Sequence, residues 1–142
     1  MDLDMEQLLK ALDNDQNEYL LHLNTQKIKQ MKYDILRELD LEPELLNEIM
    51  VKLKEYKYCD EINDFRQGGH VRWIPLKDPE NIHLSTPCMF CETKIEDSGV
   101  VIICKNFARK HYHLKMDECL FFQKLANQEL VMLSALDYLS KK

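Results

Sequence analysis

Apolar side chains recur every three or four residues through the first sixty positions of the chain. This spacing is typical of amphipathic helices, which bury one stripe and expose the other faces. It predicts helices over residues 3–12, 28–39 and 45–53, and Pro43 suits the first turn of the third. We expect the two longer helices to form an antiparallel hairpin joined near Leu41-Glu42. Their apolar stripes then form core, or one of them is a docking face for a partner.

The pattern changes at Gly68-Gly69, after which short β-rich segments alternate with turn residues. The turn at residues 96–99, where Gly99 is free to take a positive φ, joins two segments into a predicted hairpin. From Asp117 to the end the apolar spacing predicts helix again, with a break near Asn127. The predicted extended segments are residues 70–75, 81–86, 89–95, 100–104 and 111–116.

Helices followed by short strands and then by helix indicate an α+β fold. We expect an N-terminal helical hairpin, a central small antiparallel sheet or barrel, and a C-terminal helix. The corresponding division is an acidic helical region, residues 1–65, and a β-rich domain, residues 66–142, closed by C-terminal helices.

Charge is distributed unevenly between these two regions, although the whole chain has a net charge of −6. Residues 1–65 contain 8 Lys/Arg and 16 Asp/Glu, which gives −8, whereas residues 66–142 contain 11 and 9, which gives +2. An acidic surface repels phosphate, so the first region does not suit nucleic acid. We expect it to dock a protein partner or a second copy of the chain.

The chain has no run that approaches the roughly 18 apolar residues of a membrane helix. Its first residues are acidic, unlike a secretory signal. These features predict an intracellular protein without a membrane partner. Its five cysteines, an odd number, are then free thiols or metal ligands.

Cysteine and histidine form one candidate site in the β-rich region. A C-x-x-C turn supplies two zinc ligands, and a hairpin could bring a histidine and a further cysteine to complete a tetrahedral set. Strand alternation offers a different interpretation, in which Met89, Cys91 and Ile95 point into a core and the histidines of residues 111–116 face solvent. The zinc ligands of the first alternative are Cys88, Cys91, His113 and Cys119.

Basic and aromatic residues form a second candidate site. Exposed aromatic rings can stack on bases while Lys and Arg contact phosphates. Lysines on a strand edge also protect against aggregation, which is the alternative interpretation. The candidate nucleic-acid or partner-binding residues are Arg72, Trp73, Lys105, Arg109, Lys110, His111, His113 and Lys115.

No catalytic signature occurs in the sequence: there is no phosphate-binding glycine loop, no G-x-S-x-G and no H-E-x-x-H. The acidic clusters fall at predicted helix ends, where carboxylates serve as caps or surface charge. We therefore expect no enzyme activity and no cofactor, with zinc as the alternative.

Two segments resemble small conserved proteins of nucleocytoplasmic large DNA viruses. In that family a glycine precedes an RWI-like strand, here Gly69 and Arg72-Trp73-Ile74, and a helix follows an MDE turn, here Met116-Asp117-Glu118. The resemblance spans residues 56–140 and implies a source, in the host cytoplasm or the virion, without an assigned chemistry.

The layout of C-x-x-C, hairpin, Tyr112-His113 and a later cysteine also resembles a treble-clef zinc finger of the poly(ADP-ribose)-polymerase type. That family has two residues between its histidine and last cysteine, whereas this chain has five, residues 114–118. Our leading hypothesis is a non-catalytic binding or assembly protein, similar to a large-DNA-virus accessory factor, that contacts a protein or nucleic acid through a basic strand face. The alternative is a structural zinc module.

Overall fold

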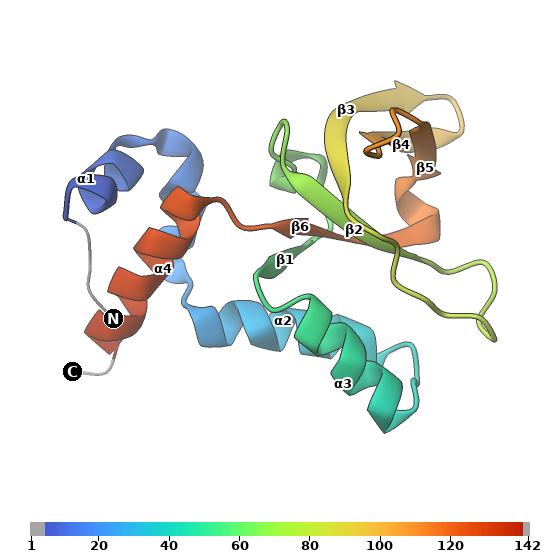
Figure 1. Ribbon diagram of the computed structural model, residues 1–142, viewed down its shortest axis with the longest axis horizontal. Helices are drawn as coiled ribbons and strands as arrows, with labels where there is room; N and C mark the ends of the chain where they lie inside the picture. The colour runs from blue at the N-terminus through green and yellow to red at the C-terminus, as the bar shows by residue number, and fades with distance from the viewer. Residues whose placement is uncertain (1–4, 141–142) are drawn as a thin grey trace.

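The computed structural model describes residues 5–140, apart from the side chain of Gln16, and confirms the predicted α+β class (Figure 1). Helices form both ends of the described chain and strands form its middle. The helices are α1 (Met5–Asp13), η1 (Asp15–His22), α2 (Thr25–Arg37), α3 (Pro43–Lys52), η2 (Ile62–Asp64), η3 (Met116–Glu118) and α4 (Asn127–Ser140), with η marking 3-10 helices. The strands are β1 (Tyr56–Cys59), β2 (His70–Pro75), β3 (Cys88–Glu96), β4 (Gly99–Lys105), β5 (His111–Lys115) and β6 (Cys119–Lys124).

The strands between residues 56 and 124 form one antiparallel sheet in the order β1-β6-β2-β3-β4-β5. β2 to β5 follow one another as a meander. After η3 the chain returns to the start of the meander and places β6 between β2 and β1. β5 and β1 are therefore the two edge strands.

The sheet is curled, so one face encloses an apolar core. The rings of Trp73 on β2 and Tyr112 on β5 have centroids 5.5 Å apart, although β3 and β4 separate their strands. In a flat sheet, β2 and β5 would be about 14 Å apart. We call the enclosed cluster the inner core; it consists of Cys59, Val71, Trp73, Cys88, Phe90, Ile102, Cys104 and Phe121.

Helices α2 and α3 cover the opposite, outer face of the sheet at β1, β6 and β2. The chain reverses between α2 and α3, as the apolar stripes predict (Figure 1). Both helices contribute buried side chains to a cluster that they share with the sheet. Their shared cluster consists of Leu36, Ile49, Leu53, Tyr56, Ile74, Leu120 and Phe122. Among residues 5–140, no α-helix covers the outer face of β3, β4 and β5 in this way.

A third cluster forms the core of a helical lobe, which is made of α1, η1 and α4 and lies beside the sheet (Figure 1). Segments from the two ends of the chain thus pack on one another. The lobe is held by Ala11, Leu20, Ile28, Leu125, Met132 and Leu133. Leu3, placed in the first helix by the sequence pattern, lies outside the described residues.

Local sequence sets several element ends. The Asn24 side chain accepts a hydrogen bond of 2.8 Å from the Lys27 amide and so caps α2. Pro43 occupies the first turn of α3, where its missing N–H costs nothing. Gly99 has a φ of 125° and pairs with Glu96 across a two-residue turn between β3 and β4.

The prediction of helix from Asp117 onward was wrong for residues 119–124. These residues form β6, which pairs with β1 and β2, and helix begins only at Asn127. The run Leu120-Phe121-Phe122 is apolar on both sides because the inner core and the α2–α3 cluster bury opposite faces of this central strand. The helix implied after the MDE turn by the viral resemblance is likewise replaced by this strand.

Three smaller predictions also fail. Residues 56–59, assigned to the helical region, form the edge strand β1, and residues 81–86 form no strand. A β-bulge between Phe90 and Glu92 reverses the expected alternation at the start of β3, so that Cys88 and Phe90 are buried and Met89 is 36% exposed. Ile95 keeps the expected side and pairs with Val100, but it lies beside the β3–β4 turn and is 79% exposed.

Each of the two regions predicted on either side of residue 65 contributes an element to the other. β1 joins the sheet of the second region, and α4 of the second region packs on α1 of the first. Among residues 5–140, none of the helices is both long and apolar enough to cross a bilayer.

Candidate nucleic-acid interface

Three rows of paired residues cross β3, β4 and β5 on the outer face of the sheet. Directly paired residues of antiparallel strands point to the same side, so each row is a line of neighbouring side chains. The rows are Met89-Lys105-His111, Glu92-Ile103-His113 and Lys94-Val101-Lys115, and His70 of β2 extends the first beyond Met89. We call these rows, together with the β4–β5 loop at residues 106–110, the basic face.

The β4–β5 loop is held rigid by its own hydrogen bonds. The Asn106 amide donates to the Lys110 carbonyl at 3.0 Å, and the Arg109 amide donates to the Asn106 carbonyl at 3.0 Å. The Asn106 side chain accepts from the Lys110 amide at 2.9 Å, while Arg109 takes a positive φ of 65°. At the tip, Phe107 is 87% exposed.

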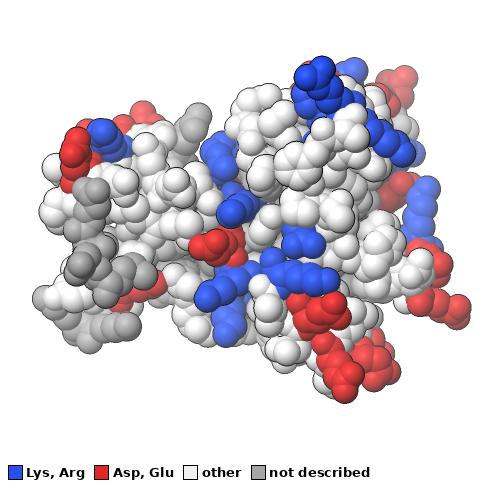
Figure 2. Space-filling view, viewed as in Figure 1, with Lys and Arg blue, Asp and Glu red and all other residues white. Residues whose placement is uncertain are grey.

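The basic face carries charge opposite to that of the whole protein. It contains five Lys/Arg (residues 94, 105, 109, 110 and 115) and one carboxylate, Glu92, which gives a net +4 with its histidines neutral, against −6 for the chain. Figure 2 shows Lys and Arg side chains over the region of β3, β4 and β5, with acidic side chains at the outer corner. Such a patch attracts polyanions even though the molecule is acidic overall.

Buried aliphatic residues form the floor of the basic face. Val101 and Ile103 point to this side of β4, yet each is only 5% exposed. Lys94 and Lys115 flank Val101 by register, and the stems of such long side chains cover apolar surface while their ammonium groups stay in water. The cations therefore rest on a rigid sheet.

Six of the eight residues predicted to contact a partner lie on the basic face. The other two do not. Trp73 points into the inner core and is 6% exposed, because it has the opposite strand parity to His70. Arg72 is half-buried on β2, where its Nε donates to the Ser85 carbonyl at 2.9 Å and holds the β2–β3 loop.

Sequence reasoning left out Phe107, His70, Met89 and Lys94. Phe107 stands between cations in a polar loop, which is a readable signal for an exposed aromatic residue. The other three reach the basic face only through cross-strand register, which one-dimensional patterns do not contain.

The four predicted zinc ligands lie on three strands, β3, β5 and β6, and are not brought together as a set. Cys88 pairs with Val71 and Cys119 pairs with Pro75, so the two cysteines are about 13 Å apart along the strand direction alone. The described residues contain no group of three or more His, Cys, Asp or Glu that could hold a metal ion. The other two predicted zinc ligands are Cys91, which lies at the bulge in β3, and His113, which is exposed on β5.

Burial, the leading cause for each thiol, makes most of the cysteines poor nucleophiles. It raises the pKa of Cys59 and of Cys104 to about 12 and that of Cys119 to about 11. It also raises the pKa of Cys88. Because the thiolate is the reactive form, these four cysteines serve as packing groups at neutral pH.

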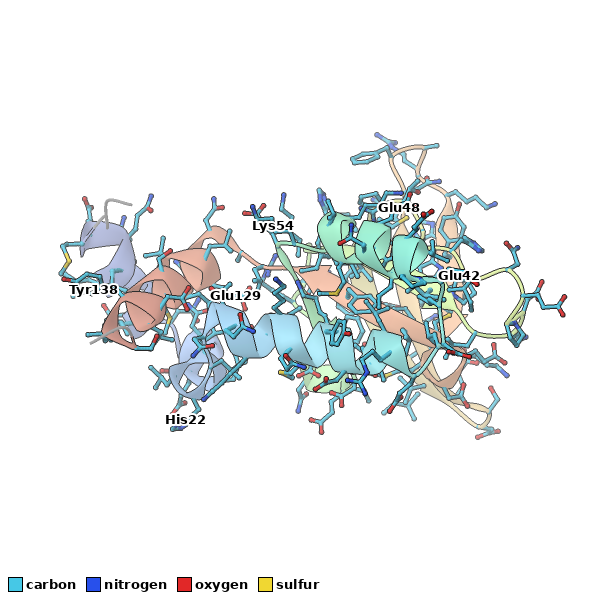
Figure 3. All side chains as sticks on the ribbon, turned by 90° about the horizontal axis from the view of Figure 1, so that it is seen from below. His22, Glu42, Glu48, Lys54, Glu129 and Tyr138 are labelled. Carbon is cyan, nitrogen blue, oxygen red and sulfur yellow. The ribbon has the colours of Figure 1, made fainter. Side chains whose placement is uncertain are left out.

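A polar cleft of about 1050 Å³ separates the helical lobe from the end of the sheet. Its floor is the side chain of Glu129 at the start of α4, which is 5% exposed and lies between the lobe and the sheet (Figure 3). This carboxylate accepts from Arg66 Nη1 at 3.0 Å and from the Ala126 amide at 2.8 Å. It also accepts from the Tyr19 hydroxyl, and Lys57 Nζ is 3.9 Å away.

The groups around Glu129 are held in place from the sheet side. The fully buried Gln123 amide accepts from the Arg66 N–H and donates to the Arg66 carbonyl, both at 2.7 Å. A Cβ on Gly69 would lie 2.5 Å from Gln123 Nε2, so a side chain at this position would push the Gln123 amide out of its hydrogen bonds with Arg66. Burial and the Glu129 charge raise the pKa of Tyr19 far above the ordinary tyrosine value, so its hydroxyl remains a donor. We interpret this network as the joint between lobe and sheet, because every charged group on its floor has a partner.

No protein-family model matches this chain, and neither the curated proteins nor the solved structures include a significant match. The resemblances drawn from the sequence therefore stay predictions, and function has to be argued from the geometry.

Proposed function

We propose that this is a non-catalytic binding protein whose basic face contacts nucleic acid. The observation that supports the proposal is the concentration of five cations and one exposed aromatic ring on β3 to β5 and the β4–β5 loop of an otherwise acidic molecule. Phosphate contacts supply most of the affinity in such interfaces. The setting suggested by the viral resemblance is an accessory factor of a large DNA virus.

The charge distribution supports an oriented contact. A polyanion is attracted by the basic face and repelled by the acidic helical region, so it can approach from one side only. β5 is also an edge strand, so the backbone edge that faces away from β4 is open to an extended partner. Both features fit a protein that holds one nucleic acid strand against the sheet while its helical lobe remains free for another partner.

The proposal predicts salt-dependent binding that depends on particular cations. We expect a fluorescent single-stranded oligonucleotide of about 16 nucleotides, near the upper site size of small binding modules, to bind at low salt. If most of the five cations contact phosphates, the plot of log K against log salt should have a slope of about −2 to −3.5. The triple variant Arg109→Glu, Lys110→Glu, Lys115→Glu should lose binding, as measured by fluorescence anisotropy.

A matched control separates local contacts from total charge. Lys10→Glu, Lys29→Glu and Lys54→Glu change the net charge by the same amount, but these exposed residues lie on the helices and in the loop after α3. The control triple should retain binding. Absence of wild-type binding at low salt, or an equal loss in both triples, would contradict the proposal. Stronger binding to an acidic polypeptide than to the oligonucleotide would replace nucleic acid by a protein partner.

An assembly role for the helical lobe has its own support. Met5, Leu9 and Leu12 follow one another at helical spacing on α1 and are 60%, 58% and 51% exposed. Leu8 and Ala11, on the other side of α1, pack in the lobe core. An exposed apolar stripe of this kind on a soluble helix fits a docking surface for a protein.

A further inference from the structure

We propose that the tip of the β4–β5 hairpin is a base-stacking site, in which Phe107, His70 and Met89 receive an unpaired base of a single-stranded nucleic acid. The inference rests on the proposed function and goes further, because it names the form of nucleic acid that the basic face selects. None of these three residues is explained by contacts with phosphate, since only one of them can carry charge.

Phe107 is presented to solvent at the tip of a loop whose backbone is tied by hydrogen bonds. Its ring is 87% exposed, whereas the loop that holds it is closed by three hydrogen bonds between Asn106 and the residues Arg109 and Lys110. When a base stacks on the ring, the conformational entropy that is lost therefore comes from the side chain and not from the loop backbone.

Phe107 also has neighbours suited to a base. The His70 ring lies 6.2 Å from the Phe107 ring, with the planes at 81°, and Met89 is paired with His70 across β2 and β3. Met89 is 36% exposed despite its position within the sheet. Together they provide an aromatic face, a second ring and a polarizable sulfur at one end of the basic face, which is the chemistry that base stacking uses.

The groups that would hold the nucleic-acid backbone are regularly spaced along β5. His111, His113 and Lys115 are on one face of β5 at alternate positions, about 6.6 Å apart. Consecutive phosphates of an extended single strand have a similar spacing. A strand that lays its phosphates along β5 therefore brings the base at its end to the hairpin tip. Lys110 does not lie on this path: its Nζ is 5.1 Å from the ring centroid of Tyr112, which packs against the inner core on the other side of β5.

A duplex cannot use this site without cost. Its bases are stacked on one another, so a base must first be unpaired and turned out, which is unfavourable, before it meets Phe107. Phosphate contacts remain available to a duplex. The site should therefore make the protein prefer single strands over duplexes, with little preference for sequence, because every base has a stacking face.

The test is a cycle that removes the ring and the bases separately. Binding of wild type and Phe107→Ala is measured by anisotropy with three probes: a single-stranded oligonucleotide, the same strand with abasic sites, and its duplex. For the intact single strand, Phe107→Ala should weaken binding roughly 5- to 150-fold, as expected for loss of one stacked base. For the abasic strand and the duplex, the variant should bind like wild type. Phe107→Tyr should retain most of the affinity.

The outcomes distinguish the two proposals. If wild type binds none of the probes at low salt, the proposed function fails and this inference fails with it. If wild type binds the three probes equally and Phe107→Ala has no effect, the basic face still binds nucleic acid but the stacking site does not exist. Loss of binding to all three probes in Phe107→Ala would instead show that the hairpin shapes the phosphate contacts, and would also overturn the stacking site.

Discussion

Lys32 shows at the residue scale how a buried charge can be used structurally. It lies on α2 with 2% of its surface exposed and donates to the Leu53 carbonyl at 2.6 Å and the Lys54 carbonyl at 3.3 Å. These are carbonyls at the C-terminal end of α3, where a cation is favoured. Burial, and next the charge of Lys29, lower the pKa of Lys32 from 10.5 to about 8.

This pKa predicts a pH-dependent contribution to stability. Below pH 8 both the folded and the unfolded protein hold the proton, so Lys32 contributes no slope. Between pH 8 and pH 10.5 the unfolded chain binds more protons at this position, so the Lys32 contribution to the free energy of unfolding rises with pH. We expect a rise on the order of 2–3 kcal/mol over this interval.

The measurement is urea unfolding of wild type and Lys32→Met across that range. Buried thiols and tyrosines act in the opposite direction, because the unfolded chain loses their protons first. The Lys32 contribution is therefore the difference between the two proteins. Lys27→Met, which removes an exposed lysine from the same helix, is the control. A difference that does not change with pH would show that Lys32 titrates normally.

At the scale of secondary structure, the clearest lesson comes from β6. Its residues are apolar on both faces because two cores bury it. A short apolar run in which apolar and polar residues do not alternate predicts helix as well as strand. β2 and β4 were predicted almost to their ends, since proline or glycine bounds each of them. The face of β3 could not be predicted, because one extra residue at the bulge reverses every side chain after it.

The joint between α4 and the sheet gives a prediction at this scale. Glu129→Gln keeps the shape of the side chain but removes the charge that Arg66 and Lys57 share. We expect the free energy of unfolding to fall by about 2–4 kcal/mol, because partly buried cations are left without their counter-ion.

Glu48→Gln is the matched control for this variant. Glu48 pairs with Lys52 at 3.0 Å, but its side chain is 58% exposed on α3 (Figure 3). This exposed pair is worth about 0.3–0.5 kcal/mol. The free energy of unfolding of both variants is measured with a denaturant. If both variants lose the same small amount, the joint does not stabilise the docked lobe.

At the scale of the whole molecule, opposite surfaces have different characters. The helical lobe exposes an apolar stripe on α1, while the far side of the sheet carries the basic face. The two surfaces do not overlap, so the two proposed contacts could form at the same time. This arrangement fits a protein that joins an assembly through one end and holds a polyanion at the other.

The α1 stripe predicts self-association, because two copies of one apolar stripe can pack against each other about a two-fold axis. Light scattering at increasing protein concentration should give a mass above the 17.0 kDa of one chain. Leu9→Glu should restore the monomer mass. Ile95→Glu, which changes a still more exposed residue at the other end of the molecule, should not. If the protein is a monomer at all concentrations, the stripe does not mediate self-association and would bind a different protein instead.

The sequence by itself determined the class of fold, the first three helices, most strands and the concentration of cations between residues 105 and 115. These properties follow from local spacing and from glycine and proline, which act over a few residues. Only the tertiary structure decided that β6 is a strand, that Trp73 is buried, and that the cysteines of β3 and β6 lie apart. It also placed His70 and Met89 beside Phe107. Register, bulge and curl set these distances, and they depend on pairings between residues far apart in the chain.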